Sequence, residues 1–295
     1  MSGIETMTVA LRIEAALEAA IARGEQDDAP PKLAAALRHA VFPGGARVRP
    51  NLCLAVAAAC GDDNPAIADA AAAAIELLHC ASLVHDDLPC FDDAATRRGK
   101  PSVHAVFGQP LAVLAGDALI VMAFDVLARG AVTTPQRLPG LLSTITRGVG
   151  MPNGIVAGQG WESEPFTPVE SYHRAKTGAL FVAATTAGAL AAGSDPGPWR
   201  VLGEKLGAAY QVADDLADAV SSEQVCGKPT GQDAAFQRPN LVAKLGLKGA
   251  YGQLETLVGE AAAAIPPCAG AKDLRDLVQM QASRLAPKQA ARSAA

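Results

Sequence analysis

The chain has 295 residues, of which 50% are hydrophobic and 4% aromatic, and its formal net charge at pH 7 is −5. This length and apolar content suffice for one large domain or two small ones. The negative net charge argues against a broad nucleic-acid-binding surface, and the scarcity of aromatic residues argues against platforms on which bases could stack.

Helical periodicity recurs from end to end, whereas the alternation typical of strands is nearly absent. Alanine, which has the highest helix propensity, dominates the apolar positions. The expected helices span residues 6–23, 31–41, 48–60, 65–88, 110–129, 136–150, 168–192, 198–219, 239–245, 248–264 and 271–286. Because no connecting segment is long or polar enough to mark a boundary, these helices predict one all-α domain over residues 1–295.

The N-terminal segment has no basic region followed by an apolar run, so we expect no secretory signal and a cytoplasmic protein. The most apolar stretch, residues 178–193, is short for a membrane span and contains Thr185 and Thr186, so we expect a buried helix there. The six cysteines show no CxxC pairing, which fits reduced thiols in the cytosol.

A first acidic cluster, Asp86-Asp87-Leu88-Pro89-Cys90-Phe91-Asp92, stands at the end of the expected helix 65–88. His79, Ser82 and Asp86 share a face of that helix. Asp92 lies past the helix end, so a turn must bring it back toward Asp86.

Two arginines, Arg97 and Arg98, follow this first cluster. Each guanidinium group offers a fork of donors that suits phosphate oxygens. Taken alone, the cluster and its arginines also fit a solvated acidic loop with ordinary surface arginines.

A second acidic cluster lies more than a hundred residues further on. Gln211, Asp214, Asp215 and Asp218 follow helical spacing and are expected to project from one face. Crowded carboxylates repel each other, and hard cations bound by oxygen ligands relieve this repulsion. Lys228 lies in a following glycine-bearing loop that could close over a phosphate. The two clusters together predict a Mg²⁺ and diphosphate site.

Several motifs together resemble the trans-isoprenyl (polyprenyl) diphosphate synthases over about residues 33–246. The resemblance is carried by PGGARVRP (43–50), DDLPCFDD (86–93) followed by Arg97-Arg98-Gly99, Gly158-Gln159, YHRAKTG (172–178) and QVADDLAD (211–218). It implies the all-α isoprenoid synthase bundle around a central cavity, usually as a homodimer. It also implies a Mg²⁺-dependent prenyltransferase that joins isopentenyl diphosphate to dimethylallyl, geranyl or farnesyl diphosphate.

The resemblance also implies roles for individual residues. The implied metal ligands are Asp86, Asp87, Asp92, Asp214 and Asp218. Those implied to hold the allylic diphosphate are Arg97, Lys176, Thr177, Gln211 and Lys228, with Lys176, Thr177 and Gln211 as the catalytic residues. Those implied to hold isopentenyl diphosphate are Arg49, His79 and Arg98. Gln159 is expected to orient a substrate or metal-bound group.

The chain departs from the family pattern at several positions, among them Pro239-Asn240-Leu241 in place of Thr-Tyr-Pro. Ala46 stands where the family usually has a lysine, and Arg47 is expected to substitute for it. Arg238 replaces a further lysine and preserves its charge. Glu162 stands where the family pattern has an aspartate.

The chain length of the product is expected to depend on Ala81, five residues before Asp86. An aromatic residue there tends to stop growth at fifteen carbons in the family. A small residue, together with the two extra residues of the first motif, resembles the bacterial geranylgeranyl diphosphate synthases of the carotenoid branch. An apolar tunnel below the first cluster is expected to hold the growing chain, because each added carbon contributes about 0.8 kcal/mol on burial.

Other functions remain open from the sequence. A farnesyl diphosphate synthase is one alternative. A class I terpene cyclase also ionises allylic diphosphates at an aspartate-rich motif, although its second metal motif normally mixes Asn, Ser or Thr with Glu. A non-catalytic partner subunit that tunes a synthase is the third alternative.

Overall fold

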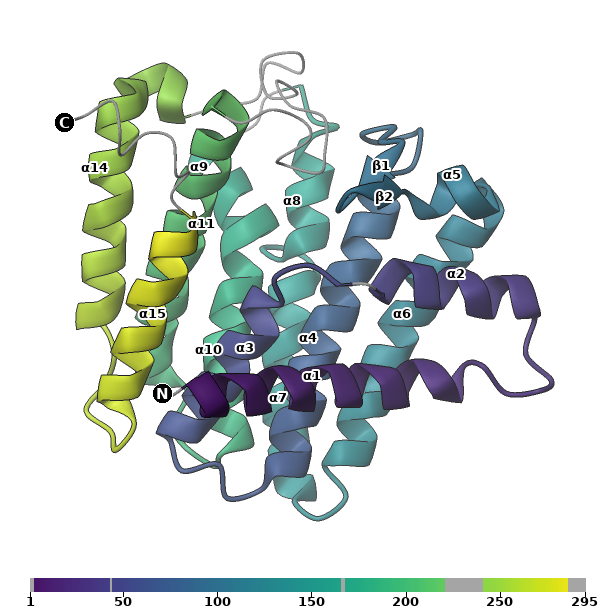
Figure 1. Ribbon diagram of the computed structural model, residues 1–295, viewed down its shortest axis with the longest axis horizontal. Helices are drawn as coiled ribbons and strands as arrows, with labels where there is room; N and C mark the ends of the chain where they lie inside the picture. The colour runs from purple at the N-terminus through teal and green to yellow at the C-terminus, as the bar shows by residue number, and fades with distance from the viewer. Residues whose placement is uncertain (1–2, 43, 166–167, 221–240, 286–295) are drawn as a thin grey trace.

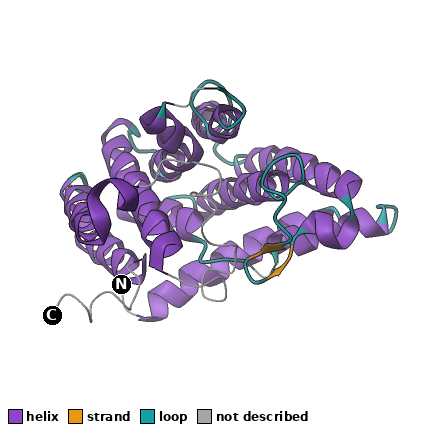
Figure 2. Cartoon of the chain, turned by 90° about the horizontal axis from the view of Figure 1, so that it is seen from above, coloured by secondary structure: helices purple, strands orange, loops and turns teal. Residues whose placement is uncertain are grey.

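The computed structural model describes residues 3–42, 44–165, 168–220 and 241–285. In this part of the chain nearly all regular structure is helical, and one short strand pair is added (Figures 1 and 2). The longer helices are α1 (Gly3–Arg23), α2 (Pro31–Val41), α3 (Val48–Ala59), α4 (Pro65–Asp86), α6 (Gln109–Gly130), α7 (Leu138–Val149), α10 (Ala179–Ala191), α11 (Arg200–Val220), α14 (Leu241–Ala263) and α15 (Ala271–Leu285). The prediction of an all-α fold is confirmed.

Short elements complete the architecture. They are the strands β1 (Thr96–Arg97) and β2 (Lys100–Pro101), the helices α5 (Val103–Phe107), α8 (Ile155–Trp161) and α9 (Val169–His173), the π-helical turn η2 (Arg174–Gly178), and the 3-10 turns η1 (Pro135–Arg137) and η3 (Gly197–Trp199). The two strands form an antiparallel hairpin in which Arg97 pairs with Lys100.

Helix α4 is the central element of the bundle. It packs most extensively against α6 and also against α3 and α10 (Figure 1). Its alanine run, residues 70–74, is buried, and so are Ile75, Leu77 and Leu78. The helix is apolar almost all round because other helices cover it on several sides. Its small alanine side chains let those helices approach closely.

Two helices, α4 and α6, are long and apolar enough to cross a membrane by length and composition alone. In α4, 78% of that apolar stretch is buried inside the protein, as expected for a core helix. In α6 the buried share is only 39%, so this helix keeps an apolar face outside the single chain.

The two helices that carry the acidic clusters point the same way. Helix α4 ends at Asp86 and α11 ends at Val220, and both run toward the upper side of the molecule in Figure 1, where the β1–β2 hairpin also lies. The elements η2 and α8 contact each other there, with η2 against α11 and α8 against α4.

Some elements differ from the expectation. The hairpin, α5 and α8 were not predicted because each is too short to show a period. The helices expected at 239–245 and 248–264 form one element, α14, interrupted at Gly246, whose φ of 70° and ψ of 168° are not helical. The break explains the two separate periods. Residues 239 and 240 lie outside the described part of the chain.

Candidate active site

The first acidic cluster folds back on the end of α4, as the sequence predicts. The backbone N–H of Asp92 donates to the carbonyl oxygen of Asp86 at 2.9 Å, and that of Ala94 donates to the carbonyl of Asp87 at 3.1 Å. The turn after the helix therefore returns Asp92 to the neighbourhood of Asp86.

The Asp86 carboxylate is buried and held by residues from two other elements. Its Oδ1 accepts a 2.6 Å hydrogen bond from Nε2 of Gln159 and lies 3.8 Å from the Lys176 ammonium group. Burial raises the pKa of Asp86, and the Asp92 carboxylate adds to this effect, whereas Lys176 and Gln159 oppose it. A further cation beside this pair of carboxylates would relieve the cost of keeping Asp86 charged.

Asp87 is paired inside the protein. It is 2% exposed, and its Oδ1 accepts a 2.8 Å hydrogen bond from Nε of Arg97. Burial raises the pKa of Asp87, and the bond to Arg97 offsets part of that rise. The role of Asp87 as a metal ligand and the role of Arg97 as a diphosphate ligand stay predictions. Each role requires the residue to bind its ligand while it is paired with the other residue.

Lys176 and Thr177 occupy the π-helical turn η2, a distortion that is frequent at functional sites. Glu162 accepts 2.6 Å bonds from the Lys176 ammonium group and from the Tyr172 hydroxyl. Helix α8 approaches the turn so closely that a Cβ atom on Gly158 would lie 2.5 Å from the Lys176 backbone. The glycine of the glycine–glutamine pair therefore allows the contact that places Gln159 and Lys176 around Asp86.

The residues of the second cluster lie on helix α11 as predicted, but they differ in burial. Asp215 is 1% exposed, accepts a 2.9 Å bond from Nε2 of Gln211 and accepts a 2.8 Å bond from the backbone N–H of Leu241 at the start of α14. Asp214 and Asp218 are half-buried. Asp215 thus fastens α14 to α11, and Asp214 and Asp218 remain the predicted metal ligands.

A continuous set of contacts joins the two clusters. Lys176 lies beside Asp86, and the next residue, Thr177, donates a 2.8 Å hydrogen bond to Oε1 of Gln211 on α11. The structure therefore places Asp86, at the end of α4, and Gln211, on α11, on either side of one short turn. The remaining predicted diphosphate ligands, Lys228 and Arg238, lie outside the described residues.

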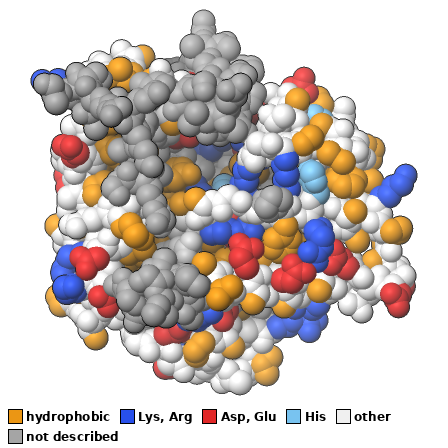
Figure 3. Space-filling view, viewed as in Figure 1, with side chains coloured by type: hydrophobic (Ala, Val, Ile, Leu, Met, Phe, Trp, Pro, Cys, Tyr) orange, Lys and Arg blue, Asp and Glu red, His pale blue; other side chains and the backbone are white. Residues whose placement is uncertain are grey.

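A group of basic side chains adjoins the first cluster. Nη1 of Arg49 lies 3.4 Å from Nε2 of His79, and the Arg49 guanidinium stacks 4.7 Å from the ring centre of Phe181. Burial, and then the charges of Arg49 and Arg98, hold the pKa of His79 well below 6.5, so this histidine is neutral. The Arg49 Nε atom is buried without a hydrogen-bond partner. Basic side chains gather near the middle of the face seen in Figure 3.

Ala46 and Arg47 occupy different environments. Ala46 is exposed, whereas Arg47 is 7% exposed and its Nη1 lies 2.7 Å from Oε1 of Glu76. Nε of Arg47 also donates a 2.8 Å bond to Glu14. The expectation that Arg47 replaces the family lysine at a substrate stays a prediction, and the structure shows this arginine already engaged by two carboxylates.

The carboxylates present suit a metal ion that is completed by a ligand. Among the described residues, no three histidine, cysteine or carboxylate side chains come close enough to hold a metal ion by themselves. Asp86, Asp92, Asp214 and Asp218 offer hard oxygen donors, and Mg²⁺ commonly takes one or two carboxylates together with phosphate oxygens of a substrate.

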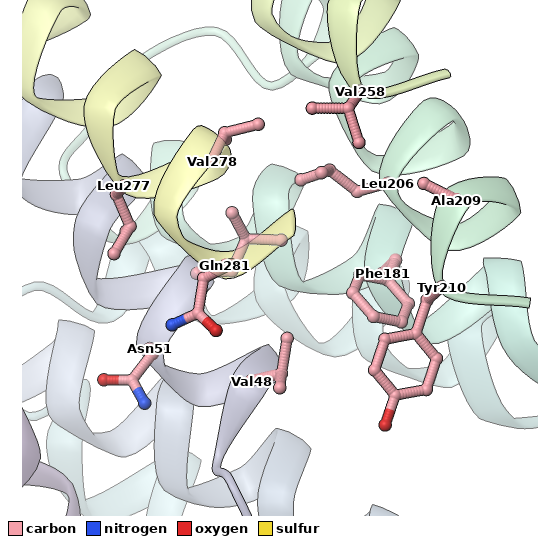
Figure 4. Close-up of a pocket in the computed structure, with 11 residues that line it drawn as sticks. Val48, Asn51, Phe181, Leu206, Ala209, Tyr210, Val258, Leu277, Val278 and Gln281 are labelled. Carbon is pink, nitrogen blue, oxygen red and sulfur yellow. The ribbon is translucent and has the colours of Figure 1, made fainter. Parts of the chain in front are cut away.

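A small pocket with a mostly apolar lining lies between α3, α10, α11, α14 and α15 (Figure 4). Phe181 and Tyr210 form part of its wall, and both rings also contact the Arg49 guanidinium. Among the described residues that line it, none comes from α4, so this pocket is not the expected tunnel below Asp86. The tunnel, the central cavity and the role of Ala81 stay predictions; Ala81 itself is 1% exposed.

Comparison with known proteins decides the family. The polyprenyl synthetase family model matches residues 30–267. The chain belongs to the polyprenyl synthetase family. It is 57% identical, over 95% of its length and 97% of the relative's, to the geranylgeranyl diphosphate synthase of Cereibacter sphaeroides. It is 51% identical to that of Rhodobacter capsulatus, over 95% of this chain and 96% of that one.

Solved structures of the polyprenyl synthetase family share the fold. The Helicobacter pylori geranyltransferase, solved with magnesium and isoprenyl diphosphate, superposes with a TM-score of 0.78 at 28% identity and covers 92% of this chain and 96% of that one. The resemblance predicted from the motifs is therefore confirmed, and so is the prediction that the chain is an enzyme of this family.

Sequence reasoning missed two positions that the structure places at the site. Glu76 lies among the arginines, and its signal was available, since it is the one charged residue within the alanine-rich run 70–78. The burial of the Asp215 side chain could not be predicted from the sequence, because its partner, the backbone N–H of Leu241, lies 26 residues later.

Proposed function

We propose that this chain condenses isopentenyl diphosphate with an allylic diphosphate to give geranylgeranyl diphosphate, with Mg²⁺ as its metal and with one domain covering residues 1–295. The observation that carries this proposal is the short bridge from Asp86 through Lys176 and Thr177 to Gln211. Lys176 lies between Asp86 and Gln211, and Gln211 is on the helix that carries Asp214 and Asp218, which supports one shared site for a metal-bound diphosphate. The names of the relatives support the twenty-carbon product over the alternatives considered above.

The chain's own residues would hold the metal and the leaving group. Asp86, Asp92, Asp214 and Asp218 would bind Mg²⁺, which supplies positive charge where negative charge develops on the departing diphosphate. Lys176 would share its charge between Asp86 and the allylic diphosphate. Thr177 and Gln211 would orient that diphosphate through the hydrogen bond that they already form.

The basic group beside the first cluster would bind isopentenyl diphosphate. Arg49 and Arg98 supply charge, and neutral His79 supplies a hydrogen-bonding ring nitrogen. The Arg49 Nε atom, buried without a partner, is a donor that a diphosphate oxygen would satisfy. The double bond of isopentenyl diphosphate then attacks the allylic carbon as the carbon–oxygen bond to diphosphate breaks, and the released diphosphate takes up the proton lost from the product.

We further propose that the enzyme is a cytoplasmic homodimer. The apolar side chains of α6 support the dimer, because Val113, Leu114 and Val121 are 41%, 49% and 67% exposed in the single chain. A second copy of the same helix would cover them in a two-fold interface.

Product analysis tests the proposed activity. The purified chain is incubated with Mg²⁺, isopentenyl diphosphate and dimethylallyl, geranyl or farnesyl diphosphate in turn, and products are measured by mass spectrometry. We expect a linear twenty-carbon diphosphate as the end product. A cyclic hydrocarbon, or no turnover without a second protein, would overturn the proposal.

A further inference from the structure

Glu76 is a buried carboxylate on α4, ten residues before Asp86 and 1% exposed. Its Oε1 lies 2.7 Å from Nη1 of Arg47 and 3.6 Å from Nη2 of Arg98. Two arginines from segments 51 residues apart in sequence therefore converge on one oxygen atom.

The backbone is shaped to make this convergence possible. Arg47 and Arg98 have φ angles of 50° and 55°, in the left-handed region that residues other than glycine seldom adopt. Glycines provide the room: a Cβ atom on Gly44 would lie 2.1 Å from the Arg47 guanidinium carbon, and one on Gly45 would lie 2.9 Å from Nε of Arg98. Both segments are thus bent so that their arginines reach the same carboxylate.

A second set of contacts fastens these segments to each other. The Lys100 ammonium group donates a 2.6 Å bond to the carbonyl of Phe42 and another bond to the carbonyl of His39. His39 in turn lies 2.8 Å from the carbonyl oxygen of Pro101. The hairpin that carries Arg98 is therefore held against the end of α2, just before the loop that carries Arg47.

The charges around Glu76 do not cancel. Arg47 and Arg98 form ion pairs with it, and Arg49 lies close enough to interact with it electrostatically, as Arg49 also does with Asp214. Among the described hydrogen bonds and ion pairs, the only other carboxylate that contacts these arginines is Glu14, which binds Arg47. Glu14 is half exposed and has no described contact with Arg98. Glu76 is therefore the carboxylate that links Arg98 to the loop preceding Arg49, while positive charge remains for a diphosphate.

We propose that Glu76 is a positioning residue for isopentenyl diphosphate: it fixes the Arg98 guanidinium and the Arg47–Arg49 segment in one arrangement that receives the diphosphate group. This inference rests on the proposed function. Glu76 touches no reacting atom, so its loss should weaken the binding of isopentenyl diphosphate and leave the allylic substrate and the chemical step nearly unchanged.

The direction in which the affinity for isopentenyl diphosphate changes on loss of Glu76 separates a positioning role from a purely electrostatic one. Removing a negative charge next to three arginines would, by charge alone, strengthen the binding of an anion. Losing the group that orients the arginines weakens that binding. At metal sites, the loss of a partner that orients a ligand typically costs ten- to a hundredfold, and we expect an effect of this order here.

The test is steady-state kinetics of Glu76→Gln with each substrate varied in turn. We expect the KM for isopentenyl diphosphate to rise about tenfold or more, with kcat and the KM for the allylic diphosphate within about twofold of the wild type. The matched control is Glu14→Gln, which removes the other Arg47 partner and should leave the KM for isopentenyl diphosphate unchanged.

An unchanged or lowered KM for isopentenyl diphosphate in Glu76→Gln would overturn the proposal, and so would an equal rise in Glu14→Gln. If Glu76→Gln does not fold, Glu76→Asp keeps the buried negative charge between Arg47 and Arg98 but shortens its reach, and should fold. It is expected to show a selective rise in the KM for isopentenyl diphosphate. Wild-type turnover is measured alongside, so failure of the proposed activity is seen separately from failure of this role.

Discussion

The hydroxyl group of Thr177 donates a 2.8 Å hydrogen bond to Oε1 of Gln211. Since Lys176 lies 3.8 Å from Asp86, this bond connects the first acidic cluster to the helix that carries the second. Thr177→Val keeps the shape of the side chain and removes the donor. We expect kcat/KM for the allylic diphosphate to fall roughly tenfold, the kinetic equivalent of about 1.4 kcal/mol, at the upper end of the net value of a hydrogen bond.

The control for this prediction is Thr177→Ser, which retains the hydroxyl group and should recover most of the activity. Steady-state kinetics with geranyl and farnesyl diphosphate measure both variants. Equal activity of the valine variant and the wild type would show that the bond contributes nothing to catalysis.

The stability of the protein should depend on pH through His79. Burial and then Arg49 and Arg98 hold its pKa well below 6.5, so the unfolded chain binds a proton below about pH 6.5 that the folded protein does not bind. The free energy of unfolding therefore increases with pH up to that value and gains nothing further from this group above it, with a slope of at most about 1.4 kcal/mol per pH unit.

Urea unfolding of the wild type and of His79→Gln between about pH 5 and pH 8 measures this dependence. The variant should lose stability less steeply on acidification, because it has no histidine to protonate. Parallel curves for the two proteins would mean that folding does not lower the pKa of His79.

Chain length should respond to Ala81. This side chain is 1% exposed on α4, five residues before Asp86. Ala81→Tyr would fill the space below the first cluster, so we expect the main product to shorten from twenty to fifteen carbons. Ala66→Tyr, at an exposed position of the same helix, should leave the product unchanged, and mass spectrometry of the products distinguishes the two. Twenty-carbon product from a folded Ala81→Tyr variant would refute the tunnel.

The homodimer should depend on the exposed apolar face of α6. Val121 is 67% exposed in the single chain, and Val121→Asp would place a charge in the proposed interface. We expect the molar mass measured by light scattering to drop from that of a dimer to that of a monomer. Val132→Asp, at a 75% exposed valine just beyond the helix, is the control. A dimer that persists in Val121→Asp would exclude this face.

The sequence predicted the long helices well because each has a clear period and a proline or glycine near its ends. Asn64-Pro65 and the run to Asp86 defined α4 closely, with Pro65 at the first turn of the helix. Helix α8 was hidden, since its seven residues include Gly158 and Gly160, which read as breakers. Its position beside Lys176 depends on packing that no local pattern contains.

The candidate site was predictable where residues lie close in sequence and unpredictable where partners are distant. The return of Asp92 to Asp86 follows from a short turn. The ion pair between Arg47 and Glu76, 29 residues apart, could not be predicted from a local pattern. The same holds for the hydrogen bond from the backbone N–H of Leu241 to Asp215. The sequence analysis assigned charged residues to ligands from their chemical type alone. The structure shows that several of them also form ion pairs or hydrogen bonds between helices and loops.

The most direct test of the proposed active site measures whether the two acidic clusters bind the same ligand. Mg²⁺-dependent binding of an unreactive allylic diphosphate analogue is titrated calorimetrically to the wild type, Asp86→Asn, Asp214→Asn and the double variant. We predict that each single change removes most of the binding and that the double change adds little, because both carboxylates act on the same metal-bound diphosphate. Wild-type affinity in Asp214→Asn, or independent losses that multiply in the double variant, would contradict a shared site.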